Sequence, residues 1–485
     1  MPNSESTTAL AESDVSTWDL RTEVLIVGFG GAGACAAIES ARAGAATTVL
    51  ERASGGGGTT ALSTGVCYLG GGTRVQRDCG FADSVDDMLA YVRLAAGQGV
   101  DEDRIRLFCE SSVEHFDWLC ELGVEFKSAY EPEKTTHPFG EEGLHLSGNE
   151  NVHPFAEHAR PVPRGHKPRH PGEAGAYLMR VLNRAAETAG AEVLCDCRAR
   201  RLVKNAAGRV VGVVARRDNR DVTIRAERGV ILCAGGFIMN ERMLQKHAPL
   251  LLRCNYKAGC PGDDGSGIVI GEGGGAEAIN MSEGLVLNAY YPPGKHVMGI
   301  LVDANGQRFI DEDAYIGRAS DAMLRVADGR AWLVVDNELY GVTQVPHRLA
   351  AVEESFAALE ESLGMPRGEL VHTIDTYNRH ARRGEDPLFH KSRDYVRPLH
   401  VPPYAALDCT TSGSIYGALT LGGLSTSALG AALDAQGQPI AGLFAAGRNA
   451  AGLCREGRTY ASGLSIADAT FFGRVAGRVA ASGRW

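Results

Sequence analysis

Two hydroxyl-bearing residues lie two positions apart near the end of the chain, in Tyr460-Ala-Ser462-Gly463. The residues that follow, Leu464 to Gly477, keep an apolar face at helical spacing, so we expect a helix to begin beside them. A helix N-terminus offers unpaired backbone N–H groups and a partial positive charge. The two hydroxyls could therefore move a proton while N–H groups near Gly463 stabilise negative charge that develops on a substrate.

A complete dinucleotide-binding pattern lies near the start of the chain. The apolar run 23–28 predicts a buried strand, and residues 34–43 predict an alanine-rich helix after it. A second predicted strand, 47–51, ends in an acid. The turn between the first strand and the helix contains Gly28, Gly30, Gly31, Ala32 and Gly33. Such glycines let the backbone approach a pyrophosphate, the helix N-terminus faces it, and the acid can bind a ribose hydroxyl.

A long loop rich in Gly, Thr and Ser, residues 52–65, follows this acid directly, whereas an NAD domain would begin another strand and helix. Three further glycine elements occur at 229–236, 262–265 and 442–447. Together, these five elements resemble the FAD contacts of the flavoproteins related to fumarate reductase and succinate dehydrogenase. The resemblance covers roughly residues 20 to 480 and implies that FAD is the cofactor.

The resemblance also implies which residues contact FAD. They are Gly28, Gly30, Gly31, Ala32, Gly33, Glu51, Arg52, Ser54, Thr59, Thr60, Ser63, Thr64, Gly65, Ala234, Gly235, Gly236, Asp264, Ala446, Gly447, Arg448, Leu464, Ser465 and Ile466. Succinate dehydrogenases attach FAD through a histidine in the second loop. Residues 55–65 contain no histidine, so we expect FAD to bind non-covalently.

The same pattern predicts an α/β fold with a Rossmann-like FAD-binding domain in two pieces and an inserted α+β capping or catalytic domain. We expect a disordered tail at 1–18, the FAD-binding domain at 19–282 and 405–485, and the cap at 283–404, where the glycine elements are missing. Within the cap, 299–306 and 331–335 resemble strands, and 348–363 and 368–382 resemble helices. A site between the two domains is the expected place for a ligand.

Fumarate reductases of this group grip a dicarboxylate with arginines and a histidine, because charges that leave water must be paired. Where they carry Arg-Leu-Gly-Gly-Asn, this chain has Tyr460-Ala-Ser-Gly-Leu464. Their substrate histidine precedes a Thr-Met-Gly-Gly run, whereas here Leu419 precedes Thr-Leu-Gly-Gly. Their acid arginine follows a run like Arg308-Phe-Ile-Asp-Glu, which here leads to Tyr315. With these charged residues replaced, we expect a neutral and apolar substrate.

This combination resembles the 3-ketosteroid dehydrogenases, most closely those of the Δ4-(5α) type. In that group a Tyr-x-Ser-Gly element precedes the last helix, and another tyrosine follows the Arg-Phe-Ile-x-Glu strand. Tyr460, Ser462 and Tyr315 match these positions. Δ1-dehydrogenases carry a Tyr-Pro-Gly-type turn instead, from which Tyr460-Ala-Ser-Gly463 departs. The resemblance implies that a 4,5 double bond is introduced into a saturated 3-ketosteroid.

In that chemistry, flavin N5 takes the hydride from carbon 5 and a protein base takes a proton from carbon 4. Tyr460 is the candidate base, with Ser462 and Tyr315 as a relay and N–H groups near Gly463 as donors to the carbonyl. A phenol with a pKa near 10 needs help at neutral pH, for which Arg318 and Arg458 are the candidates. Packing roles for the tyrosines, and a helix-capping role for Ser462, remain alternatives.

Three other functions stay open on the sequence. One is Δ1-dehydrogenation, another is a flavin reductase of the fumarate or enoate type, and the third is a flavin redox carrier without turnover. No haem or iron–sulfur motif is present, so the electron acceptor is an unidentified partner. Six histidines between His137 and His170 lie in what we expect to be a long loop, and their spacing does not favour a metal site.

The composition limits the remaining possibilities. A net charge of −10 argues against a nucleic-acid partner, and no apolar run approaches the length of a transmembrane segment. The N-terminus lacks the features of a secretory signal. The twelve cysteines are scattered without a CxxC pair, which is typical of reduced thiols in a cytoplasmic enzyme.

Overall fold

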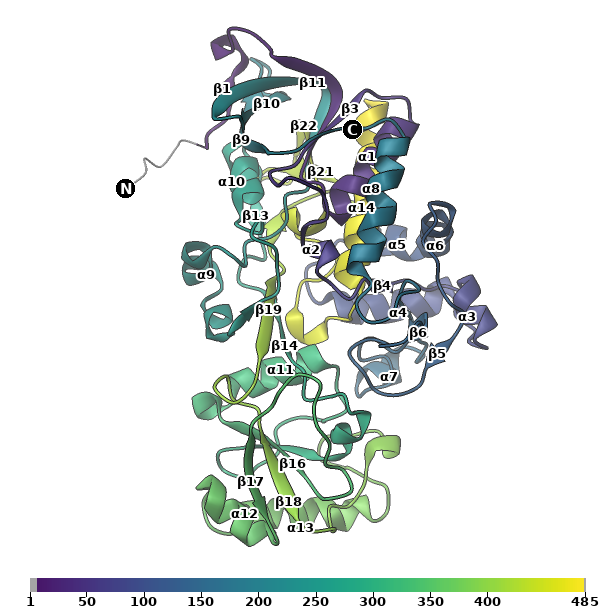
Figure 1. The fold of residues 1–485 in the computed structure, drawn as a ribbon, viewed down its shortest axis with the longest axis vertical. Coiled ribbons are helices and arrows are strands. Elements are labelled where there is room, and N and C mark those ends of the chain that lie inside the picture. Colours follow the sequence, from purple (N-terminus) through teal and green to yellow (C-terminus); the bar gives the residue numbers. More distant parts are fainter. Residues whose placement is uncertain (1–6, 484–485) are drawn as a thin grey trace.

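The computed structural model describes residues 7–483, and its upper part is built on a nine-stranded sheet (Figure 1). The main order is β1-β9-β10-β11-β2-β3-β8, and β22 extends from β11 and carries β21. The strands are β1 (Leu10–Ala11), β2 (Leu20–Val27), β3 (Thr47–Leu50), β8 (Glu192–Leu194), β9 (Cys197–Lys204), β10 (Val210–Arg217), β11 (Arg220–Leu232), β21 (Ala431–Leu433) and β22 (Pro439–Ala445). Strands β2, β3, β8, β11 and β22 pair in parallel.

Three helices lie together beside this sheet: α1 (Gly31–Arg42), α8 (Gly175–Thr188) and α14 (Leu464–Ser482) (Figure 1). Glycines bring α14 against α1 at close range. A Cβ added at Gly473 would lie 2.3 Å from the Ala32 carbonyl oxygen, and one at Gly477 would lie 2.4 Å from that of Ala36. The small residues thus set the position of α14 relative to the glycine turn that begins α1. On the other side of the sheet region lie α9 (Glu241–His247) and α10 (Ser266–Gly273).

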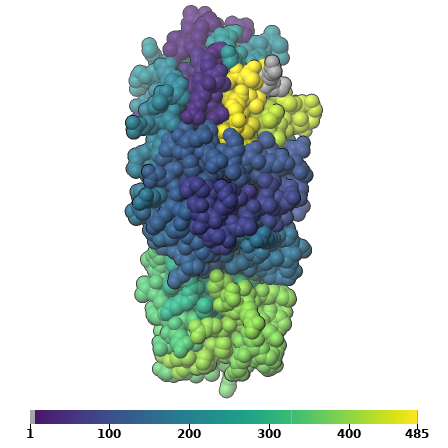
Figure 2. All heavy atoms as spheres, turned by 90° about the vertical axis from the view of Figure 1, so that its right-hand side faces the viewer, coloured from purple at the N-terminus to yellow at the C-terminus, as the bar shows by residue number. Residues whose placement is uncertain are grey.

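A mostly helical segment forms the middle of the molecule and covers much of the face in Figure 2, between the sheet-rich upper part and the green lower part. Its helices are α2 (Gly58–Ala61), α3 (Arg74–Asp78), α4 (Val85–Ala96), α5 (Glu102–Glu110), α6 (Ser112–Glu121) and α7 (Phe155–His158). A small sheet of order β4-β7-β6-β5 accompanies them, formed by β4 (Cys67–Tyr68), β5 (Tyr130–Glu131), β6 (Leu144–His145) and β7 (Gly165–His166). The long loop expected around the histidines therefore contains two strands and a helical turn.

The lower part is a sheet of order β15-β16-β18-β17 with helices on it (Figure 1). Its strands are β15 (Ile300–Asp303), β16 (Ala331–Val335), β17 (Leu349–Glu353) and β18 (Tyr404–Asp408), and its helices are α11 (Ile316–Arg325), α12 (Phe356–Leu363) and α13 (Glu369–Ala381). Between the two parts lie β14 (Gly284–Asn288), β19 (Tyr416–Thr420) and β12 (Tyr256–Lys257), with β13 (Ala278–Ile279) pairing β20 (Gly423–Leu424).

Three sequence expectations differ from this fold. The tail was expected to be disordered to residue 18, but Leu10 pairs with Val203 at the edge of the main sheet; residues 1–6 lie outside the described range. The helix expected at 348–363 is a strand followed by α12, because 349–353 pair with β18 and the Ser355 hydroxyl caps α12. Strand β18 also belongs to the lower sheet, so that sheet extends past the expected boundary at 404.

The buried histidines of the small sheet are held neutral. His166 lies with Nδ1 2.9 Å from the Arg164 carbonyl oxygen and Nε2 2.8 Å from the Thr73 hydroxyl, which suits one donating and one accepting nitrogen. Burial lowers the pKa of His166 from 6.5 to about 4. Within the described range, no group of three His, Cys, Asp or Glu side chains is arranged to hold a metal ion.

This histidine makes stability depend on pH. Between pH 6.5 and about 4 the unfolded chain binds a proton at His166 that the folded chain does not, so folding weakens as the pH falls. Relative to His166→Gln, the wild type should lose about 1.4 kcal/mol of unfolding free energy per pH unit in this window. Urea unfolding of both proteins at several pH values measures the difference. A difference that stays constant from pH 7 to 4.5 would show that His166 titrates normally.

Candidate flavin site and tyrosine pair

Loops from distant parts of the sequence meet at one edge of the main sheet. Val27 is in register with Leu50 on one side and Leu232 on the other, and Leu232 is in register with Ala445. All four residues end parallel strands, so the segments that follow them leave from the same edge. The glycine turn after β2, Glu51 after β3, the 233–236 turn and the 446–448 turn are brought together in this way.

The first turn is one that only glycine can form. Gly28 has φ +99°, and a Cβ there would lie 2.5 Å from the Cys233 carbonyl oxygen. At Gly33 a Cβ would lie 1.9 Å from the Gly28 carbonyl oxygen. Below this turn, the Glu51 carboxylate accepts the Phe29 N–H at 2.8 Å and the Ala53 N–H at 2.8 Å. The backbone is thus held in the open form that lets a phosphate approach it.

Two acids, which follow Gly262, organise the other side of this edge. Asp264, expected from the sequence, pairs with Arg52 at 2.7 Å and accepts the Ser266 N–H at the start of α10. Asp263, which was not expected, accepts the Thr59 hydroxyl at 2.5 Å and pairs with Arg448 at 2.6 Å. Among the described residues, the Arg448 Nη1 atom is buried without a hydrogen-bond partner, so this cationic donor is free to bind an anionic or carbonyl oxygen there.

The other residues expected to contact FAD lie in the loops at this edge or in the first turn of α14. The Gly31 N–H lies 3.3 Å from the Thr60 hydroxyl, and Ser63 donates to the Thr60 carbonyl oxygen. The adjoining turns contain Thr64, Gly65, Ala234, Gly235, Gly236, Ala446 and Gly447. The first turn of α14 contains Leu464, Ser465 and Ile466. Ser54 lies in the same loop as Arg52, and both residues are exposed.

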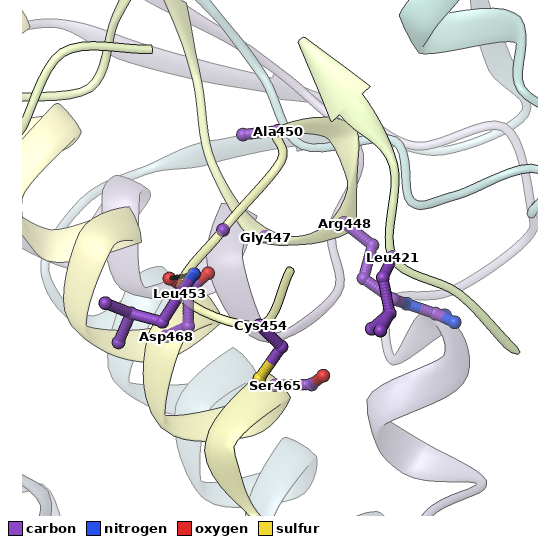
Figure 3. Close-up of a pocket in the computed structure, with 9 residues that line it drawn as sticks. Leu421, Gly447, Arg448, Ala450, Leu453, Cys454, Ser465 and Asp468 are labelled. Carbon is purple, nitrogen blue, oxygen red and sulfur yellow. Dashed lines mark hydrogen bonds between the residues drawn. The ribbon is translucent and has the colours of Figure 1, made fainter. Parts of the chain in front are cut away.

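A small cavity of about 20 Å³ lies between the 447–454 segment and the first turn of α14 (Figure 3). Cys454 and Ser465 lie next to each other on one side of it, and Arg448 and Leu421 lie on the other (Figure 3). The Arg448 guanidinium, which pairs with Asp263 through Nη2, and the start of α14 therefore border the same space, although they are separated along the chain. The glycine turns, the free donor of Arg448 and the helix N-terminus together fit a dinucleotide cofactor.

The two candidate tyrosines are brought together across the two parts of the fold. Tyr460 follows a short 3-10 helix, Gly457–Thr459, and Tyr315 directly precedes α11. Their rings are stacked with centroids 6.3 Å apart at 30°, and each residue is 5% exposed. Ser462 lies beside them, and its hydrogen bond to Tyr315 opposes the rise in the Tyr315 pKa that burial causes.

The surroundings of Tyr460 act on its phenol in opposite directions. Burial raises the pKa of Tyr460 above its ordinary value, and the nearby Cys454 adds to this rise. The Ser465 N–H, which lies 3.4 Å from the phenol oxygen, lowers the pKa, as does the charge of Arg448. A phenolate at this point would therefore be stabilised by the first turn of a 19-residue helix and by a cation across the small cavity.

Three sequence interpretations of this element need correction. Arg318 and Arg458 were the candidates for a positive potential, but Arg318 pairs with Asp311 and Arg458 with Glu456. Ser462 does not cap the helix, because the N-cap is Gly463, with φ +94°. The Leu464 N–H donates to the Ala461 carbonyl oxygen at 3.2 Å. Within residues 7–483, the Gly463 N–H has no hydrogen-bond acceptor, so it is one donor that a substrate carbonyl could use.

Comparison with known proteins agrees with this geometry. Residues 23–459 match the family described as an FAD binding domain. The chain belongs to this flavoprotein family. The solved structure of a 3-ketosteroid-Δ4-(5α)-dehydrogenase from Rhodococcus jostii RHA1, in complex with 4-androstene-3,17-dione, is 40% identical, covers 98% of this chain and 99% of its own, and has a TM-score of 0.93. A 3-oxo-5-alpha-steroid 4-dehydrogenase from Comamonas testosteroni is 28% identical, over 90% of this chain and 94% of its own.

A probable fumarate reductase from Shewanella frigidimarina is 27% identical, over 95% of this chain and 75% of its own length. The flavoprotein is thus an FAD-dependent oxidoreductase, which confirms the cofactor and the α/β fold class expected from the glycine elements. Among residues 7–483, no helix has the length and apolar character that crossing a bilayer requires. All twelve cysteines are free thiols.

Several residues that shape the site escaped the sequence analysis. Asp263 is adjacent to the expected Asp264, and a reading of both acids after Gly262 would have included it. Asn449, whose side chain accepts the Ala234 N–H at 3.0 Å, follows the expected turn directly. Ser147 and Asn149 contact the segments of Ser462 and Tyr315, but they lie in an irregular segment with no motif, so no local signal identified them.

Proposed function

We propose that this flavoprotein is a 3-ketosteroid dehydrogenase that introduces a 4,5 double bond into the A ring of a saturated 3-ketosteroid. One observation carries the proposal. The two buried tyrosines are stacked at the N-terminus of α14. The fumarate reductases that the sequence resembles carry an Arg-Leu-Gly-Gly-Asn run at this point. Hydroxyls and a helix end suit a neutral ketone whose neighbouring carbon must lose a proton, and they do not suit a dicarboxylate.

In the proposed reaction, bound FAD supplies the acceptor for the hydride that leaves carbon 5. The residues that would hold FAD are the glycine turns 28–33 and 446–448, Glu51 and Arg448. The Gly463 N–H donates a hydrogen bond to the 3-oxo oxygen, which makes the protons on carbon 4 more acidic. Non-covalent attachment is part of the proposal, since the second loop has no histidine.

Tyr460 takes the proton from carbon 4 at its phenol oxygen. The Ser465 N–H and Arg448 favour the phenolate that this requires, against the effect of burial. Ser462 and Tyr315 then form the proposed relay: Ser462 accepts a proton from Tyr460 as it gives its own to Tyr315, and Tyr315, whose ring is stacked on Tyr460, releases its own hydroxyl proton towards solvent. Enclosure of both tyrosines keeps water away from the phenol oxygen until substrate is in place.

Flavin absorbance provides the direct test. Mixing the purified holoprotein anaerobically with a 5α-3-ketosteroid should bleach the oxidised flavin, and the product should be the 4-ene-3-one. A steroid that already has the 4,5 double bond separates the Δ1 alternative, since only a Δ1-dehydrogenase would be reduced by it. Absence of bleaching with every 3-ketosteroid would exclude the proposal and favour the redox-carrier alternative.

The reverse chemistry, reduction of fumarate or another enoate, is the second candidate in this family. Relatives include a probable fumarate reductase. The resemblance to this group places its arginines where this chain has Tyr460 and Ile316, and its substrate histidine where this chain has Leu419. Reduced enzyme mixed with fumarate should therefore stay reduced. The electron acceptor of the dehydrogenase and its cytoplasmic location remain predictions.

A further inference from the structure

A four-residue segment, Ser147-Gly-Asn-Glu150, contacts the backbone of both relay residues. The Ser462 N–H donates to the Ser147 carbonyl oxygen at 2.8 Å, and the Ser147 hydroxyl donates back to the Ser462 carbonyl oxygen at 3.0 Å. On the other side, the Tyr315 N–H donates to Asn149 Oδ1 at 2.8 Å. Ser462 belongs to the start of α14 and Tyr315 to the start of α11, so this segment joins two elements that are distant in sequence.

The segment is itself held in place. The Glu150 carboxylate is fully buried and accepts the Gly148 N–H at 2.8 Å. The Asn149 N–H donates to the Tyr91 hydroxyl at 2.8 Å. A Cβ at Gly148 would lie 2.3 Å from that hydroxyl and 2.7 Å from the Ala461 Cβ, so only glycine allows the close contact. The acceptor that faces Tyr315 therefore has little freedom to move.

We propose that segment 147–150 is a positioning element for the relay, and that Asn149 sets the place of Tyr315 relative to Ser462 and Tyr460. Neither Ser147 nor Asn149 has to touch the substrate, because both act through the backbone of the residues they hold. The inference rests on the proposed function for its effect on rate. The structural part of the inference is that this segment joins the start of α11 to the start of α14. That part does not depend on the identity of the substrate.

Asn149→Ala removes the acceptor of the Tyr315 N–H and lets the start of α11 shift. A displacement of about 1 Å can lower a rate by about 10²-fold. We expect this loss in the single-turnover rate of flavin reduction by a 5α-3-ketosteroid, with KM and FAD binding little changed. Asn149→Ser keeps a neutral side-chain oxygen that can accept a hydrogen bond and should recover part of the rate, which a general loss of packing would not explain.

A matched control is Asn378→Ala in α13. Asn378 is also buried and also bridges a backbone, since it exchanges two hydrogen bonds of 2.7 Å with Leu399, far from the tyrosine pair. This control should lower stability without changing the rate. A double mutant completes the test: if Asn149 acts through Tyr315, adding Asn149→Ala to Tyr315→Phe should cost less than it does in the wild type. Additive losses would overturn the proposal.

Amide hydrogen exchange separates the failure of this inference from the failure of the proposed function. Asn149→Ala should speed exchange in the segments around both Tyr315 and Ser462, with no such change in Asn378→Ala. If no steroid reduces the wild type, the function is wrong, but the exchange result still decides the inference. Unchanged exchange at both segments would overturn it. If Asn149→Ala does not fold, Ser147→Ala replaces it, because it removes only one hydroxyl. This variant should also slow flavin reduction and speed exchange in the two segments, by smaller factors. If it changes neither, the proposal is overturned.

Discussion

Replacing Tyr460 by phenylalanine is expected to slow flavin reduction by a 5α-3-ketosteroid by about 10²–10⁴-fold, the usual contribution of a positioned acid or base. The ring remains, so the stacking on Tyr315 and the packing of the buried site should persist. FAD should stay bound, because the proposed cofactor contacts lie in the glycine turns and at Arg448. Stopped-flow absorbance under anaerobic conditions measures the rate, and flavin content of the purified variant measures binding.

Tyr416→Phe is the matched control for this prediction. Tyr416 is also a buried tyrosine, and its hydroxyl donates to the Cys409 carbonyl oxygen in another part of the fold. The Tyr416→Phe variant should have a lower free energy of unfolding and an unchanged rate of flavin reduction. Because burial raises the pKa of Tyr460, the wild-type rate should also climb with increasing pH above neutrality. A Tyr460→Phe enzyme that turns over at the wild-type rate would show that the base is another group.

Gly473→Val is expected to weaken both folding and cofactor binding. Its Cβ would lie 2.3 Å from the Ala32 carbonyl oxygen, so α14 must move away from α1. Overpacking of this kind costs roughly 3 kcal/mol of unfolding free energy. Since α1 begins at the glycine turn and α14 begins at the tyrosine element, their separation should also raise the dissociation constant for FAD and slow flavin reduction. Denaturant unfolding and flavin fluorescence titration measure these changes.

Gly417→Ala provides the comparison. Gly417 is buried in β19, but a Cβ there meets its nearest neighbour, the Tyr256 ring, at an ordinary 3.6 Å. This variant should bind FAD like the wild type. If Gly473→Val binds FAD equally well and unfolds at the same denaturant concentration, the close contact of the two helices does not position the site.

The local pattern of the sequence was sufficient for the flavin half of the fold. The apolar run before Gly28, the glycine turn and Glu51 are consecutive, and each is dictated by backbone geometry over a few residues. Strand β16 and helix α13 were also expected close to their observed bounds, because their periodicity is uninterrupted. In contrast, 348–363 was assigned to one helix because its apolar residues also fit a helical period, and only the pairing with β18 makes its first part a strand.

For the tyrosine element too, some properties follow from the sequence and others only from the fold. The sequence itself contains Tyr460, Ser462 and Tyr315 and lacks the charged residues that bind a dicarboxylate. These residue types are enough to favour a neutral ketone as substrate over a dicarboxylate. Which charge faces Tyr460 is a property of the fold. Arg318 and Arg458 are near in sequence to the two tyrosines and pair with Asp311 and Glu456. The cation whose charge lowers the pKa of Tyr460 is Arg448, which follows β22 and also pairs with Asp263.

The sequence alone therefore determined the cofactor, the fold class and the identity of the residues proposed for proton transfer, since these depend on short motifs. The tertiary structure decided how those residues are held. Parallel strands in register bring four turns to one edge, glycines let α1 and α14 approach, and Asn149 and Ser147 join the segments of Tyr315 and Ser462. Such contacts link residues that are far apart along the chain, and no local pattern encodes them.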